Sequence, residues 1–391
     1  MTRLAPGDVG PLPAGSHLLH IGPQKTGSTA LQWSLHRQRE ELAEHGVVYP
    51  GPGVRPRYAL GAGLGYSTPR GGRQASRRAW RRLLDQIAEP TARLVCVSHE
   101  AFGRATDAQV AETVASLGGD RPHVLMVARR YDRLLPSQWQ QRVKARMTLS
   151  YDEWLRIALG PPAPDNPVWR NIWVPHDSVA LARRWAEAVG EDNLTVLVAD
   201  ERDRTLLPSV VERMLGVPSG LLAPGDQIVN RSLSYSEVEL LRSINEHFEE
   251  RGFADQRYHR LVNRGLIRAL VTADRYPEDP PIPPLPAWAW EPLVVRSRER
   301  VEGLDRLGVR VVGDTSELAL ADDPPPGVVA APADEPPGSL RIPLVVVARA
   351  LEGLVDGAVR DRAQSLRAAG LDDPQQPADV DVEVDDDLDA D

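Results

Sequence analysis

A lysine, two glycines and two hydroxyl residues lie close together near the start of the chain, in the stretch HLLHIGPQKTGSTALQ. Gly22 and Gly27 have the spacing of the nucleotide phosphate loop G-x-x-x-x-G-K-[S/T], but Ser28 stands where that motif has its lysine. The lysine of this stretch is Lys25, two residues before the second glycine. Backbone amides after Gly27 would still converge on a phosphate at a helix N-terminus, with Ser28 and Thr29 as hydroxyl donors. The pattern predicts a phosphate site whose ammonium group points differently from that of a nucleotide triphosphatase.

The segment PQKTGSTALQ resembles the 5′-phosphosulfate loop of sulfotransferases, which is commonly written P-K-x-G-(S/T)-(S/T). Enzymes of that family use 3′-phosphoadenosine 5′-phosphosulfate (PAPS) as co-substrate and need no metal for the transfer. The resemblance implies that Lys25 contacts the phosphosulfate and stabilises negative charge on the departing phosphate oxygen. It also implies that the 5′-phosphate is held by Thr26, Gly27, Ser28 and Thr29.

The same resemblance implies a second element, a strand that ends in arginine and is followed about eight residues later by a helix serine. The stretch VLMVARRYDRLLPSQWQQ supplies both residues, with Arg129 at the strand end and Ser137 eight positions on. In the family this pair holds the 3′-phosphate, and the planar guanidinium suits it because it donates two charge-assisted hydrogen bonds. Arg130 gives a spacing of seven and is the second choice.

A third segment, VNRSLSYSEVELLRSIN, resembles a later part of the bacterial members, where an Asn-Arg-Ser turn precedes a helix. By this resemblance Asn230 and Arg231, with Ser232, complete the 3′-phosphate or adenine pocket. Capping of the following helix explains Ser232 or Ser234 equally well. The K-G-x-x-G-x-W loop of the cytosolic animal enzymes is absent, which favours the bacterial or carbohydrate-type branches.

A base that takes the acceptor's proton is expected at the end of another buried strand, in RLVCVSHEAFGRA. Parallel strands deliver their C-terminal residues to the ligand crevice, so Ser98, His99 and Glu100 are all candidates by position. We favour Glu100, because carbohydrate-type relatives have a glutamate in a comparable position. His99 follows, since an imidazole titrates near neutrality. For both residues a purely structural role, in capping or in the core, stays open.

The acceptor is not encoded in any pattern that we recognise, and the expected acceptor loops are residues 51–73 and 147–176. The arginine-rich run at 70–82 either steers an anionic acceptor or forms a solvated helix face. Three tryptophans either stack on an acceptor or adenine ring or pack in the core: Trp80, Trp139 and Trp173.

The elements that would position these residues are apolar strands alternating with amphipathic helices. The order predicts an α/β, three-layer P-loop-type fold with a central parallel sheet flanked by helices. Strands are expected at 17–22, 93–98, 123–129, 193–199 and 309–314, and at GVVYP (46–50). Helices are expected at 27–45, 74–88, 107–117, 132–146, 177–190, 205–216, 234–251 and 257–273.

Composition shifts divide the chain further. The predicted units are an N-terminal arm (1–16), a sulfotransferase-like α/β domain (17–317), a Pro-rich linker (318–338), a C-terminal helix (339–370) and an acidic disordered tail (371–391). A second Pro-rich stretch, 277–293, is expected to act as a semi-rigid connector.

Charge and cysteine content limit the location and the partners. The tail holds ten acids and no base, so removing it takes the net charge of −9 to about +1, which gives no electrostatic case for nucleic acid. The N-terminus has no apolar h-region, and no window approaches the ~18 apolar residues of a membrane span. The single cysteine, Cys96, excludes an internal disulfide. We therefore expect a cytoplasmic protein.

These patterns favour a sulfotransferase that moves a sulfuryl group from PAPS to a hydroxyl or amine of a carbohydrate or small metabolite, without a metal. One alternative is a P-loop kinase or NTPase, which would use the acid after VCVSH for Mg²⁺. The displaced lysine argues against it. The other alternative is a non-catalytic nucleotide-binding scaffold of the same fold.

Overall fold

The computed structural model describes residues 2–66, 76–89, 92–225, 231–325 and 341–368. Within these ranges seven parallel strands form one sheet in the order β1-β7-β6-β5-β2-β4-β3. The strands are β1 (Thr2–Leu4), β2 (Ser16–His20), β3 (Val47–Val48), β4 (Leu94–Ser98), β5 (Arg121–Ala128), β6 (Leu194–Val198) and β7 (Arg310–Val312).

The longer helices are α1 (Ser28–Arg37), α2 (Arg39–Glu44), α3 (Arg57–Leu64), α4 (Arg77–Ile87), α5 (Asp107–Leu117), α6 (Tyr131–Lys144), α7 (Tyr151–Leu159), α8 (Pro167–His176), α9 (Ser178–Val189), α10 (Leu206–Leu215), α11 (Tyr235–Glu250), α14 (Ala287–Arg306) and α15 (Leu344–Ala368). The shorter ones are η1 (Pro6–Asp8), η2 (Glu100–Arg104), η3 (Glu191–Asn193), α12 (Asp255–Tyr258), the π-helix η4 (His259–Ile267), α13 (Arg268–Thr272) and η5 (Thr315–Leu318).

Successive residues of a strand point to opposite sides of the sheet. Because apolar residues point to both sides here, helices cover both faces. In β4, Val95 and Val97 pack with α3, α4, α5 and α9, whereas Leu94 and Cys96 pack with α1, α2 and α10. The two covered faces make three layers. The predicted α/β fold with a central parallel sheet is confirmed.

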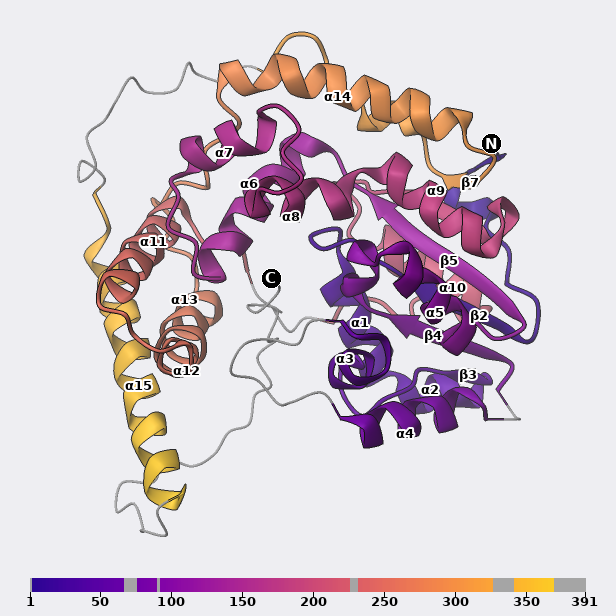
Figure 1. Ribbon diagram of the computed structural model, residues 1–391, viewed down its shortest axis with the longest axis horizontal. Coiled ribbons are helices and arrows are strands. Elements are labelled where there is room, and N and C mark those ends of the chain that lie inside the picture. The colour runs from indigo at the N-terminus through magenta and orange to yellow at the C-terminus, as the bar shows by residue number, and fades with distance from the viewer. Residues whose placement is uncertain (1, 67–75, 90–91, 226–230, 326–340, 369–391) are drawn as a thin grey trace.

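A second hydrophobic core lies among the helices beside the sheet, which include α6, α7, α8, α11 and α15 (Figure 1). Trp139 and Trp173, considered from the sequence as stacking platforms, are both buried in this core. Val346 and Ala350 of α15 are buried in it too, so the helix expected within 339–370 packs on the rest of the chain.

Several elements lie where the sequence predicted none. The stretch 1–16 contains an edge strand, β1, in which Thr2 pairs with Arg310 of β7. Helix α3 lies within the expected loop 51–73, and α7 and α8 lie within 147–176. Helix α14 begins directly after Pro286, inside the stretch expected to be a connector. Proline is compatible with the start of a helix, so a Pro-rich stretch did not exclude one there.

The sheet order places the first long strand, β2, between β4 on one side and β5 on the other. The chain leaves β2 toward β3 and β4, and then crosses to β5 and β6 on the other side. In open parallel sheets such a reversal opens a crevice at the carboxyl ends of the strands, where ligands bind. In the described part of the chain, no helix is both long and apolar enough to cross a membrane.

Candidate functional site

The loop that joins β2 to α1 makes a tight turn with an unusual backbone. Gly22, Lys25 and Gly27 have positive φ values of 78°, 66° and 97°. A left-handed conformation at a lysine costs on the order of 1–3 kcal/mol, and such strain concentrates at functional sites. The hydroxyl of Thr26 closes the turn by donating a 2.7 Å hydrogen bond to the carbonyl oxygen of Pro23. The turn leads straight into α1, whose first amides and dipole favour an anion.

Ser28, the first residue of α1, is the residue of this loop that most clearly lacks a partner. Its side chain is buried, and its Oγ makes no hydrogen bond within the described part of the chain. Leaving a buried hydroxyl unsatisfied costs about 1–3 kcal/mol. A phosphate oxygen at the helix N-terminus would satisfy it, so the loop fits the 5′-phosphate of a nucleotide.

A cavity of about 890 Å³ opens beside the loop. It brings together most of the residues predicted from the sequence: Lys25, Thr26, Gly27, Ser28, Thr29, Glu100, Arg129, Ser137 and Arg231, with Ser232. Two predicted residues are not in its wall. His99 does not line it, and Asn230 lies outside the described residues.

Arg129 directly follows β5, lies in the cavity wall and is held from two sides. Its Nε and Nη2 donate to the two carboxylate oxygens of Glu201, at 2.5 and 2.7 Å. Its Nη1 donates to the carbonyl oxygen of Lys25 at 2.7 Å, which ties the phosphate loop to the strand end. A guanidinium has five N–H donors, so two remain for a ligand. Arg130, the second choice, instead pairs with Asp132 and does not line the cavity.

Glu201 was not predicted from the sequence, although it competes directly for Arg129. Burial raises the pKa of its carboxyl, but the hydrogen bonds and positive charge of Arg129 outweigh burial and hold the pKa below its ordinary value. Glu201 is therefore an anion beside the arginine that was predicted to hold a phosphate.

Glu100 and His99 follow β4 but differ in access to the cavity. Glu100 is buried in the cavity wall, and its Oε2 accepts a 3.0 Å ion pair from Arg55, whose charge compensates that of the carboxylate. His99 turns away from the cavity, and its Nδ1 accepts a hydrogen bond from the amide of Ala101 while its ring packs near Phe102. Geometry favours Glu100 over His99 as the group that meets an acceptor.

Ser98, the third candidate at this strand end, belongs to a buried network below the phosphate loop. Its Oγ lies 2.7 Å from Nδ1 of His20 and 3.0 Å from Nε2 of Gln32. Burial lowers the pKa of His20 to about 4, so the imidazole is neutral at physiological pH. The network ties β2, β4 and α1 together as an uncharged support.

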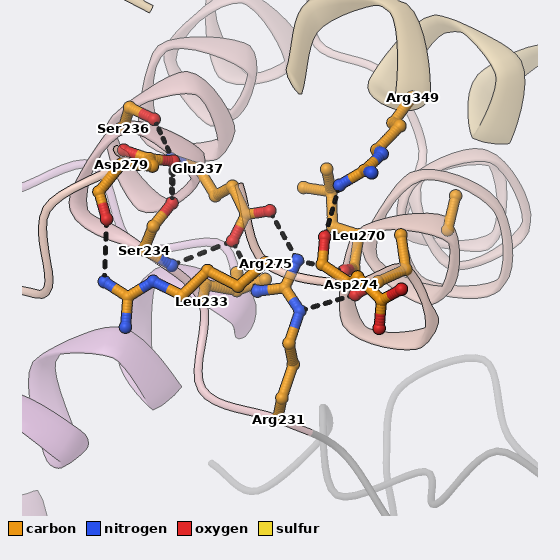
Figure 2. Close-up of polar contacts among 12 residues, drawn as sticks. Arg231, Leu233, Ser234, Ser236, Glu237, Leu270, Asp274, Arg275, Asp279 and Arg349 are labelled. Atoms are coloured by element: carbon orange, nitrogen blue, oxygen red, sulfur yellow. Dashed lines mark hydrogen bonds and ion pairs between the residues drawn. The ribbon is translucent and has the colours of Figure 1, made fainter. Parts of the chain in front are cut away.

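Arg231 lies at the other end of the cavity, and every one of its donors is used within the protein (Figure 2). Its Nε donates to the carbonyl oxygen of Ala273, and its Nη2 to that of Leu270. Its Nη1 donates to the carbonyl oxygen of Ser232, and both Nη atoms donate to the carboxylate of Glu237. These contacts favour a structural role over phosphate binding.

The cavity wall contains further side chains that the motifs did not reveal. Trp33 and Arg37 of α1 line it together with the predicted Thr29, and the spacing of four residues places all three on one face of the helix. That spacing is a signal that the sequence contained. Arg204 and Arg275 also line the cavity, but no motif marks them.

The arginine-rich run is largely solvated where it is described. Arg77, Arg78, Arg81 and Arg82 are exposed on α4 and do not line the cavity, and the earlier part of the run lies outside the described residues. Trp80 packs partly buried against the core of the sheet. In the described ranges, no group of three or more His, Cys, Asp and Glu side chains is placed to hold a metal ion.

Comparison with known proteins yields a distant structural likeness. No protein-family model matches the chain, and no curated protein matches it either. Among solved structures, the chain is similar to a sulfotransferase from Alicyclobacillus acidocaldarius, with 17% sequence identity and a TM-score of 0.38. The match covers 58% of this chain and 91% of that one. So distant a likeness assigns no function, and any assignment rests on the geometry of the cavity.

Proposed function

We propose that this protein is a PAPS-dependent sulfotransferase that transfers a sulfuryl group to a hydroxyl or amine of a carbohydrate or small metabolite. The observation that carries the proposal is the single cavity in which the Lys25 loop meets Arg129 and Ser137. These two motifs lie about a hundred residues apart in the sequence and are expected to hold the two phosphate groups of one co-substrate.

Within this proposal the loop binds the 5′-phosphate. The first amides of α1 and the buried Oγ of Ser28 donate to its oxygens. Arg129 has two N–H donors left beyond its bonds to Glu201 and Lys25, and these bind the 3′-phosphate together with the Ser137 hydroxyl. Trp33 offers an aromatic face to the adenine, a stacking contact worth about 1–3 kcal/mol.

When bound, PAPS supplies an activated sulfuryl group whose bond to the 5′-phosphate can break. The carboxylate of Glu100 takes the proton of the acceptor as the acceptor atom bonds to sulfur. Lys25 stabilises the electron pair that the breaking sulfur–oxygen bond leaves on the phosphate. Adenosine 3′,5′-bisphosphate (PAP) departs with that pair, so charge and atoms balance without a metal ion.

Calorimetry with PAP, 5′-AMP and Mg·ATP tests the binding part of the proposal without knowledge of the acceptor. We expect PAP to bind at least about tenfold more tightly than 5′-AMP, because only PAP uses Arg129 and Ser137. Tight Mg·ATP binding with indifference to PAP would instead indicate a kinase or NTPase. Binding of PAP with no transfer to any acceptor would indicate a scaffold.

Replacement of the lysine tests the chemical step. We expect Lys25→Ala to lower the rate of PAP release from PAPS, measured with a panel of acceptors, by about 10²- to 10³-fold. The melting temperature should stay near that of the parent protein. An unchanged rate would remove the lysine from the mechanism.

A further inference from the structure

Helix α15 is fastened to the protein along one face. Val346, Ala350 and Gly353 are on its buried side, and a Cβ at Gly353 would lie 2.7 Å from the carbonyl oxygen of Gly265 in η4. The two helices therefore approach more closely than any side chain at that position would allow. Figure 2 shows one of the polar contacts that add to this, from Arg349 to the carbonyl oxygen of Asp274. The opposite face of α15 is thus presented in a fixed orientation.

That opposite face is apolar and open to solvent. Four of the five exposed large hydrophobic side chains in the described chain lie on α15: Leu344, Leu351, Val355 and Val359, which are 82%, 56%, 62% and 37% exposed. With the exposed Ala348 and Ala358, the residues from Leu344 to Ala358 recur at alternating steps of four and three residues, and Val359 lies four residues after Val355. This is the spacing of a seam between two packed helices. We call these six residues the outer strip.

Two charged residues of opposite sign border the outer strip. Glu352 lies beside the middle of the strip, next to Leu351, and Arg362 lies three residues beyond Val359, and both are exposed. At 1.5 Å per residue they are separated by about 15 Å along the helix axis. Neither side chain makes an ion pair or hydrogen bond within the described residues, which leaves both charges available to another molecule.

We propose that the outer strip is the interface of a symmetric dimer, in which α15 packs antiparallel against α15 of a second copy of this chain. With the two-fold axis on the exposed face, at the level of residue 357 along the helix, Glu352 faces Arg362 of the second copy, and Arg362 faces Glu352. The same register places Val355 against Val359. A two-fold interface requires this self-complementarity, whereas a parallel pair would set Glu352 against Glu352. The inference does not depend on the proposed function.

The size of the contact sets how strong the association is. Stable interfaces bury about 1,200–2,000 Å² in total, and a single pair of packed helices reaches only the lower end of that range. The dimer is therefore reversible, and its population rises with protein concentration.

Sedimentation velocity of the full chain over a hundredfold range of concentration tests the proposal. We expect a concentration-dependent monomer–dimer equilibrium that Val355→Asp shifts to monomer at every concentration. Val295→Asp is the matched control, because Val295 is 52% exposed but lies on α14, outside the strip. It should leave the equilibrium unchanged.

Charge reversal tests the antiparallel register. Glu352→Arg or Arg362→Glu alone should weaken dimerisation about tenfold or more, because each makes two repulsive pairs, and the double reversal should restore it. A monomer at all concentrations would show that something else covers the strip, such as residues 371–391 or another protein, and would overturn the proposal. A dimer that resists both Val355→Asp and the single reversals would overturn it as well.

Discussion

Arg129 and Arg231 border the same cavity, and both were predicted from the sequence to bind a nucleotide, yet the structure sets them apart. Arg129 keeps two N–H donors after its bonds to Glu201 and to Lys25. Arg231 keeps none. The difference shows that a binding arginine is distinguished from a structural one by the number of N–H donors left unused within the protein. Residue type and nearness to a pocket do not make that distinction.

The cause is the place of each arginine in the fold. Arg129 follows the carboxyl end of β5, an inner strand of the sheet, and its guanidinium lines the cavity. Arg231 stands between two helix ends. It binds the carboxylate of Glu237 in the first turn of α11 and the last free carbonyl oxygens of α13, those of Leu270 and Ala273 (Figure 2). At the end of α13 its bonds take the place of missing helical donors, and at the start of α11 it pairs with the carboxylate that accepts from the amide of Ser234.

The largest effect that would sharpen this contrast is on stability. Arg231→Ala would leave the carboxylate of Glu237, whose side chain is 1% exposed, without its charged partner. We expect the free energy of unfolding to fall by about 3–5 kcal/mol, measured by urea denaturation. Arg129→Ala should cost no more than about 1 kcal/mol in the same measurement, because its ion pair is partly exposed, with 21% of the Arg129 and 34% of the Glu201 side chain accessible. Equal losses in the two variants would break the comparison.

The second effect is on ligand affinity and runs the other way. Arg129→Ala should weaken PAP binding by about 1.5–3 kcal/mol, the value of hydrogen bonds to a charged group, while 5′-AMP binding stays as it was. Calorimetry with the two nucleotides separates the contributions. If Arg231→Ala, measured under conditions where it is folded, lost as much PAP affinity, Arg231 would have to be counted as a ligand.

A smaller change addresses the competition for Arg129. Glu201→Gln keeps the size of the side chain but removes the negative charge beside the expected 3′-phosphate. PAP should bind a few-fold more tightly, a gain below about 1 kcal/mol, with no change for 5′-AMP. Weaker PAP binding in this variant would mean that the carboxylate orients Arg129 for the ligand instead of competing with it.

The last effect is in the pH dependence of stability. Burial raises the pKa of the Glu237 carboxyl, but hydrogen bonds and charge from Arg231 outweigh it and hold the pKa below the ordinary value of 4.5. A lowered pKa in the folded state stabilises the protein above pH 4.5, and this stability is lost as the pH falls through the folded value. In Arg231→Met the buried carboxyl has no such partner, so its contribution should change sign. Urea denaturation between pH 3.5 and 6 gives the difference in slope, and parallel profiles would contradict it.

The fold could be predicted well from the sequence because the pattern of hydrophobic residues indicates which segments form buried strands and which form helices. Leu94, Val95, Cys96 and Val97 read as a buried strand in the sequence and form β4 between two helical layers. The helices α7 and α8 were missed although their starts carry recognisable caps. Ser150 and Glu153 form a capping box, and Asn166 caps α8 ahead of a proline.

The cavity could be predicted only in part. Lys25 and Arg129 carry motifs, and the structure places both in one wall. The partners that decide how an arginine is used, Glu201 and Glu237, are fixed by chain segments that meet only in the folded protein. No local residue spacing in the sequence predicts such pairs. The roles of the predicted site residues therefore stay proposals.

The edge strand β1 has a consequence for how the protein is synthesised. Thr2 leaves the ribosome long before its partner in the sheet, Arg310. Strands β2, β4 and β5 can join while translation continues, but the N-terminal strand must wait until most of the chain has emerged. A bulky group attached next to β1 would hinder that late docking more than one attached far from this edge.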